Sequence, residues 1–280
     1  MPLAALCLLE DQALAEHWDA ARNYPSPWPT ANHFTVQMAR TFVVMALLSL
    51  RGVDGLRASV CSGVSARPIL QCSTRKAAAT GKSRRGSAPS VMFQMIIPER
   101  GVLPGVVLWL PQWLDSVRGR PYIFRAFAAH RVGRPDMASS WLDSCMCTAH
   151  MIIAWEFLLS PLYSPAQLKA MHLSLHGPRH LLAEVAKQFG PSHFSALERN
   201  ELGRWSGSES SSDFSRAKVS GMADVYAREG PAHDSELRVR LKVLSRLSDF
   251  LASRQWSAVV PAQQGVAVSF SFLSQPEALA

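Results

Sequence analysis

The chain has 280 residues, of which 48% are hydrophobic and 18% are charged, and it carries a net charge of +8. Its length and apolar content allow one large globular domain or two small ones, and the basic excess favours an acidic partner such as nucleic acid or an anionic surface. Five cysteines are too few, and odd in number, for a disulfide framework, and no apolar stretch approaches the ~20 residues that span a bilayer. These features exclude a disulfide-rich secreted protein and argue against a membrane protein.

The N-terminal part divides at a proline-rich segment. Leu8–Arg22 has the composition of a short helix, and Pro25, Pro27 and Pro29 cannot continue it, so residues 1–33 are predicted to be a truncated N-terminal segment or linker without a signal-peptide layout. Residues 34–50 then place apolar side chains at helical spacing, which predicts a buried helix that Gly52 and Gly55 end.

A basic segment without acids follows at residues 73–90. Since residues 91–97 are apolar and β-prone, this segment is expected to be a loop or the turn of a hairpin, although Ile69–Cys72 makes a poor first strand. Its basic residues are Arg75, Lys76, Lys82, Arg84 and Arg85.

Residues 176–190 have the clearest helix pattern in the sequence. Pro178 suits the first turn of a helix, an apolar face follows, and Gly190 suits a left-handed cap. His176 and Arg179 would therefore lie at a helix N-terminus, where the free N–H groups and the dipole favour an anion and a guanidinium can grip two phosphate oxygens. The alternative is a capping histidine and a surface arginine.

Two further helices are predicted from Ser164–Gln167 and Ser195–Glu198, which both have the capping-box pattern. Gly203 suits the end of the second, and Arg204 and Trp205 fall just beyond it. Trp205 is either a core aromatic or a fixed N–H donor. A serine-rich stretch at 206–220 is expected to be an exposed loop. It precedes a short helical segment that ends at Tyr226, which is either a packing residue or a nucleophile.

Beyond Tyr226, leucines at positions 237, 241, 244, 247 and 251 predict an amphipathic helix that either covers the chain's own core or packs on a second subunit. Residues 255–280 are expected to be a tail. Cys145, Cys147 and His150 lack a second ligand pair, so no metal site is predicted.

The run His176-Gly177-Pro178-Arg179-His180, then Leu202-Gly203-Arg204-Trp205, then Met222 and Tyr226 resembles the catalytic half of tyrosine recombinases, most of all recombinase-like reading frames of mobile elements in algal genomes. The resemblance is best supported over 171–247 and implies a catalytic domain over 34–254. It implies a mainly α fold with a small β-hairpin or sheet (α+β).

By this resemblance, Tyr226 is the nucleophile, Arg179 and His176 bind the scissile phosphate, and Trp205 is a donor to it. Arg57, after Gly55-Leu56, is matched to an upstream arginine of the family, and Lys82 (failing that Lys76) to its hairpin lysine. The resemblance implies that the chain cleaves and rejoins double-stranded DNA through a 3′-phosphotyrosyl link, as a homo-multimer, without cofactor or metal. The further DNA contacts are expected from Arg75, Lys76, Arg84, Arg85, His180 and Arg204. An intracellular location, nuclear in a eukaryote, is expected.

Two departures from the family pattern leave alternatives open. The interval from Trp205 to Tyr226 is 21 positions, longer than usual in the family, and the N-terminal DNA-clamping domain is expected to be absent or cut short. A non-catalytic DNA-binding relic of a mobile-element recombinase is therefore the alternative function, and an unrelated helical interaction protein is the third.

Overall fold

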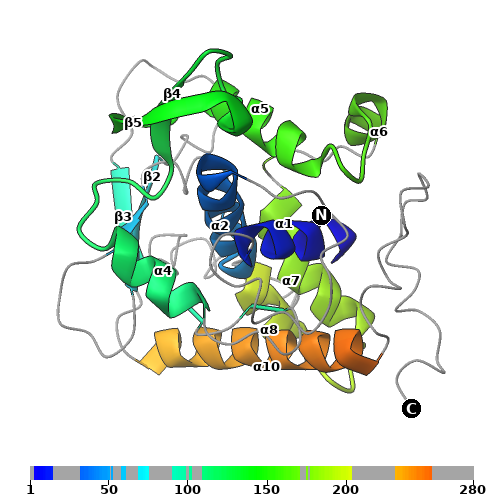
Figure 1. The fold of residues 1–280 in the computed structure, drawn as a ribbon. Helices are drawn as coiled ribbons and strands as arrows, with labels where there is room; N and C mark the ends of the chain where they lie inside the picture. Colours follow the sequence, from blue (N-terminus) through cyan, green and yellow to red (C-terminus); the bar gives the residue numbers. More distant parts are fainter. Residues whose placement is uncertain are drawn as a thin grey trace, which may run out of the picture.

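The computed structural model describes residues 3–14, 32–50, 52, 58–60, 69–75, 90–98, 101–102, 109–170, 175, 177–203 and 231–253. These residues form a mainly helical structure with small antiparallel sheets, as the sequence predicts (Figure 1). The predicted C-terminal tail and the segment that contains Tyr226 lie outside the described residues.

Helix α2 (His33–Leu47) lies at the centre of the fold (Figure 1) and confirms the predicted buried helix. Asn32 caps its start, where the Asn32 side chain accepts a hydrogen bond from Thr35 N at 2.9 Å. The helix ends before the glycines that were expected to break it. Ser49 has φ 51, and the N–H groups of Ser49 and Leu50 bond back to carbonyls of the last turn, which is the Schellman arrangement.

Helix α1 (Leu3–Leu14) packs on α2, and all twelve of its residues are buried. It begins five residues before the predicted helix, because a helix that is covered on every side shows no 3.6-residue apolar period. The buried carboxylate of Glu10 is satisfied by Val102 N at 2.8 Å and Trp109 Nε1 at 3.2 Å. These bonds tie α1 to the chain that leads into α4 (Trp109–Val117).

Strands β1 (Ser59–Val60), β2 (Ile69–Arg75) and β3 (Ser90–Ile96) form an antiparallel sheet in that order. The register pairs the start of β2 with the end of β3, and Arg75 with Ser90. This confirms the predicted hairpin, in which the basic segment connects two strands. Strand β2 is longer than the segment Ile69–Cys72 that the sequence offered as a first strand. Its own residues favour a strand only weakly, and pairing with β3 stabilises it.

A second sheet, β4 (Arg125–Ala129) and β5 (Ala138–Cys145), was not predicted. Its small and polar residues give no alternating pattern, and two register shifts interrupt the pairing. A short 3₁₀ helix, η2 (Pro135–Met137), lies in the connection between the strands.

The remaining helices are α5 (Thr148–Leu159), α6 (Pro165–Ala170), α7 (Gly177–Gln188), α8 (Ala196–Gly203) and α10 (Pro231–Ser253). Both predicted capping boxes are present. Ser164 and Gln167 bond reciprocally at 2.8 and 3.3 Å, and Ser195 and Glu198 do so at 2.7 and 3.2 Å. Gly190, two residues after the end of α7, has φ 86, as predicted for a left-handed cap.

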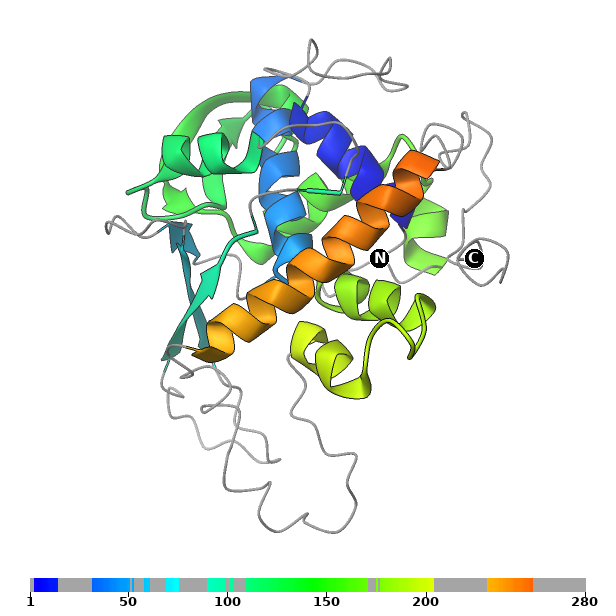
Figure 2. The same ribbon diagram turned by 90° about the horizontal axis from the view of Figure 1, so that it is seen from below.

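Helix α10 lies on one side of α2, whereas α5 and the β4–β5 sheet lie on the other (Figure 1). Seen from below, α10 crosses the molecule diagonally beside α7 and α8 (Figure 2), and it contacts both helices. Leu244, Leu247 and Leu251 of its apolar face are fully buried. The helix therefore covers the core of its own chain, one of the two roles predicted for it. Among the described helices, none is both long and apolar enough to cross a bilayer.

Candidate functional site

Arg179 is the one residue of the predicted catalytic set whose side chain the structure describes. It is the third residue of α7, and its side chain is withdrawn from solvent, with 9% of the residue exposed. A cation in the first turn opposes the helix dipole, which costs about 0.3–1 kcal/mol. His180, the next residue, is exposed.

The segment before α7 meets the segment after α2. A Cβ atom at Gly52 would lie 3.0 Å from Leu175 Cβ, and α2 and α7 pack against each other. Leu175 immediately precedes His176, and Gly52 lies five residues before Arg57, which is at most about 18 Å of extended chain. The residue after Arg57, Ala58, is buried, and its carbonyl accepts a hydrogen bond from Ile123 N at 2.8 Å.

Helix α10 is joined to the end of α2 by a buried arginine. Arg240 is 1% exposed and donates from Nη1 to Leu47 O at 2.9 Å and to Ser49 Oγ at 3.2 Å. The carbonyls of a last helical turn have no partner within the helix, so a guanidinium there satisfies an acceptor and complements the dipole. The C-terminal end of α2 is thus the point where α10 and the chain near Gly52 are anchored.

Helices α8 and α10 are joined by a salt bridge. Lys242 Nζ lies 2.8 Å from Glu198 Oε1 and 4.7 Å from the ring centroid of Phe194. The Lys242 hydrogen bond, followed by the Ser195 backbone bond, lowers the pKa of Glu198. Both side chains are partly solvated, so the pair orients the helices more than it stabilises them. Trp205 comes two residues after α8, and Tyr226 comes five residues before α10.

The β2–β3 hairpin places Arg75 at its turn end, next to the connection between the strands, and β3 contacts α10. Lys76, Lys82, Arg84 and Arg85 belong to the connection 76–89, which lies outside the described residues. His176, Arg57, Trp205, Arg204 and Tyr226 also lie outside them. Their roles, and the convergence of these side chains on one site, remain predictions.

Of the four tyrosines in the chain, the structure describes Tyr122 and Tyr163, and Tyr163 is unsuited to nucleophilic attack. Burial, and then the charge of Cys7, raises the pKa of Tyr163 to about 12, and the residue is 3% exposed. Tyr122 is half-buried and lies three residues before β4. Within the described ranges, no group of three or more His, Cys, Asp or Glu residues is placed to hold a metal ion.

A pocket that the sequence did not predict lies between α2, α4 and the β4–β5 sheet, with a volume of about 530 Å³. It contains basic, amide and aromatic side chains, and none of its lining residues is acidic. The lining residues are His33, Gln37, Arg40, Trp109, Gln112, Trp113, Ser116, Arg120, Arg125 and Trp141. The spacing of His33, Gln37 and Arg40 along an otherwise apolar helix was the signal for it, since residues at i, i+4 and i+7 share one face.

Comparisons with known proteins gave no match to a family model, to a curated protein or to a solved structure. The case for a function therefore depends on the residues of this chain and their geometry.

Proposed function

We propose that this chain is a DNA strand-transfer enzyme of the tyrosine recombinase type, in which Tyr226 attacks a phosphodiester and releases a 5′ hydroxyl. The observation that carries the proposal is the contact between Gly52 and Leu175. It brings the chain just before Arg57 next to the chain just before His176 and Arg179, which supports the proposal that these three basic residues bind one phosphate.

The other contacts limit where the remaining groups can lie. Helices α7, α8 and α10 pack on one another, and Trp205 and Tyr226 lie at most about 7 Å from the end of α8 and about 18 Å from the start of α10, respectively, by the greatest reach of the intervening residues. The hairpin, which contacts α10 through β3, bears the connection that contains Lys82. These tethers support the proposal that all six groups surround one phosphate.

The chemistry needs such a set of cations. A phenol has a pKa near ~10 and is a weak nucleophile at neutral pH, so neighbouring cations must favour its ionised form. Once the phenol has lost its proton to water, attack by the Tyr226 oxygen forms the phosphorus–oxygen bond to tyrosine as the bond to the 5′ oxygen breaks, and extra charge develops on the equatorial oxygens. Preorganised donors there give roughly 10²–10³ in rate each. In this scheme Arg179, His176 and Arg57 supply the charge, and Lys82 supplies the proton to the leaving oxygen.

The phosphotyrosyl link retains the energy of the broken DNA bond, so rejoining needs no ATP. Recombination joins paired DNA sites, so the proposal includes a multimer on double-stranded DNA. In a eukaryotic cell the enzyme would work in the nucleus. The basic excess of the chain suits a DNA partner.

The test is incubation of the full chain with nicked suicide duplexes, in which release of a short oligonucleotide traps the covalent adduct. Wild type is expected to give an adduct that survives denaturing electrophoresis, Tyr226→Phe none, and Tyr122→Phe the wild-type yield. No wild-type adduct, or equal yields from wild type and Tyr226→Phe, would overturn the proposal. Salt-sensitive duplex binding without adduct would identify a non-catalytic DNA-binding relic instead.

A further inference from the structure

The pocket between α2, α4 and the β4–β5 sheet has the composition of an anion site with an aromatic wall. Arg40, Arg120 and Arg125 come from three separate parts of the chain, α2, the turn after α4 and β4, and all three line the pocket. The pocket volume of about 530 Å³ falls within the ~300–1,000 Å³ usual for sites of small organic ligands.

The arginines are held differently. Arg40 is 3% exposed, and its Nε donates to Ala13 O at 2.8 Å, which fixes it at the base of the pocket. Arg125 bonds to Leu142 O at 2.8 Å and to Asp143 at 2.6 Å, but the Asp143 side chain is 93% exposed, so this ion pair is largely screened by water. Arg120 is exposed and forms no ion pair with any residue that the structure describes. Its pKa is lowered, first by desolvation and then by the charge of Arg125. A bound anion would relieve this repulsion.

The planar walls of the pocket are fixed by hydrogen bonds and ring contacts. Trp109 and Trp113 form the floor, since each is less than 5% exposed, and their indole N–H groups donate to Glu10 and to Gln37 Oε1. At the rim, half-buried Trp141 meets exposed His33 edge to face, at 6.2 Å and 81° between ring planes. A flat heteroaromatic ring can stack in such a corner.

The amides add specific polar contacts. Gln37 Oε1 accepts from Trp113 Nε1 at 2.7 Å, which orients its NH₂ group, and this group has no hydrogen-bond acceptor among the described residues. Gln112 of α4 is exposed and also lines the pocket. Amides at fixed orientation are the usual partners of nucleobase edges.

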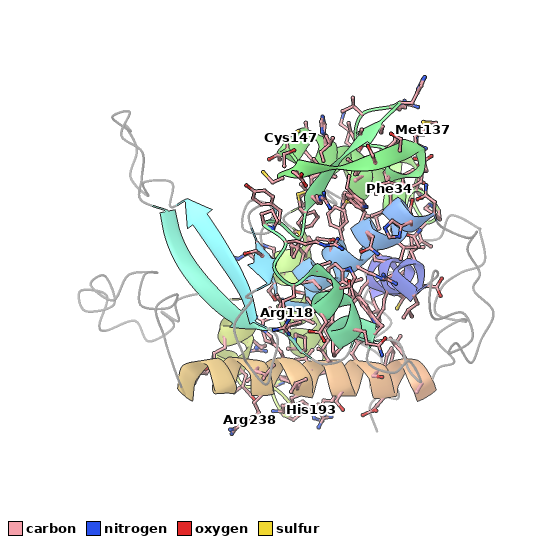
Figure 3. All side chains as sticks on the ribbon, turned by 60° about the vertical axis from the view of Figure 1, so that its left-hand side comes forward. Phe34, Arg118, Met137, Cys147, His193 and Arg238 are labelled. Carbon is pink, nitrogen blue, oxygen red and sulfur yellow. The ribbon has the colours of Figure 1, made fainter. Side chains whose placement is uncertain are left out.

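We infer that this pocket binds a nucleoside 5′-phosphate, with the phosphate on the arginines and the base against Trp141 and His33. The source is a free nucleotide or an unpaired nucleotide of a nucleic-acid strand, which share this chemistry. The inference goes beyond the proposed strand transfer and does not rest on it. Nucleotide binding is measured without DNA cleavage and adduct formation without added nucleotide, so each can fail alone. Figure 3 shows Phe34 of α2 beside the β4–β5 sheet and Arg118 near the end of α4, which frame this region.

The test is isothermal titration of the full chain with AMP, adenosine and inorganic phosphate. AMP is expected to bind with a dissociation constant below about 1 mM, and adenosine and phosphate each at least ~10-fold more weakly, because each lacks half of the contacts. Arg120→Gln is expected to weaken AMP binding by roughly tenfold, since it removes one charge-assisted contact. Arg118→Gln is the matched control: Arg118 is paired with Asp115 at 2.7 Å, does not line the pocket, and its loss should leave binding within twofold of wild type.

A second variant, Trp141→Leu, separates the two halves of the ligand. It is expected to reduce AMP binding to the level of inorganic phosphate without changing phosphate binding, and circular dichroism checks that the variant is folded. Tighter binding of AMP than of a four-nucleotide single strand assigns the free nucleotide, and the reverse assigns a strand. The inference is overturned if AMP does not bind at about 1 mM, if phosphate binds as tightly as AMP, or if the Arg120→Gln and Arg118→Gln variants behave alike.

Discussion

Replacing Arg240 by methionine tests how α10 is fixed to the body of the protein. Methionine keeps the aliphatic length of the side chain but removes the donor to Leu47 O and Ser49 Oγ. Hydrogen bonds to a charged group contribute about 1.5–3 kcal/mol each, and two buried acceptors are left without this donor. Removal of the buried charge returns part of that loss, because its desolvation cost disappears. We expect the free energy of unfolding to fall by about 3 kcal/mol.

For a chain of this size, a loss of about 3 kcal/mol lowers the melting temperature by roughly 6–12 °C. The assay is thermal unfolding followed by circular dichroism, with urea unfolding as a second measurement. Arg238→Met is the matched control, because Arg238 is exposed on the same helix and extends away from the body of the protein (Figure 3). Equal melting temperatures for the Arg240→Met and Arg238→Met variants would refute the reasoning, since desolvation would then cancel the two hydrogen bonds.

Three further predictions concern stability and reactivity. Gly101→Ala would place a methyl group on the Glu10 carboxylate, so urea unfolding should show a loss of about 3 kcal/mol as the buried hydrogen bonds of Glu10 are displaced. Iodoacetamide should alkylate exposed Cys147 in the native protein but leave Cys7 unmodified until denaturant is added, as peptide mass spectrometry would show. Cys7 is buried, and burial followed by the charges of neighbouring acids raises the pKa of its thiol. The pKa of Tyr163 is raised to about 12 in the folded protein, against about 10 in the unfolded chain. The stabilisation that Tyr163 provides should therefore be complete below pH ~10 and be lost as the pH rises to about 12. The free energy of unfolding of Tyr163→Phe should depend less on pH between these two values.

Each of these has its own control. Gly119→Ala meets no atom within 4 Å but has φ 77, so it should cost only the backbone strain of about 1–2 kcal/mol. An equal loss from both alanine variants would show that the Glu10 clash is not the cause. Equal alkylation rates for Cys7 and Cys147 would contradict the burial of α1. An unchanged pH dependence in Tyr163→Phe would mean that other groups titrate in its place.

Local chemistry made several elements predictable. The capping boxes at Ser164 and Ser195 form between residues three positions apart, so their helix starts can be predicted locally. The left-handed cap at Gly190 depends only on the conformational freedom of glycine. The hairpin was predicted from a basic segment beside the apolar strand β3. Even so, α1 and the β4–β5 sheet show the limit of such patterns. A helix buried on all sides and an irregular strand of small residues carry no period that a sequence can display.

The candidate site was predictable only in part. The sequence placed Arg179 in the first turn of a helix, but its burial and the contact of Gly52 with Leu175 depend on how α2 and α7 pack. The nucleotide pocket was not predicted, since His33, Trp113, Arg120 and Trp141 lie on separate elements and become neighbours only when α2, α4 and the second sheet meet.

The sequence by itself therefore determined the capped starts of α6 and α8, the left-handed cap after α7, the hairpin, the basic character of the chain and the order of the residues that suggest strand transfer. Those properties arise from interactions between residues a few positions apart, or from composition. The tertiary structure alone decided that Arg240 holds α10 on the end of α2, and that three arginines surround a pocket without acids. Contacts between residues far apart in sequence depend on the packing of whole elements, and no local pattern of residues encodes that packing directly.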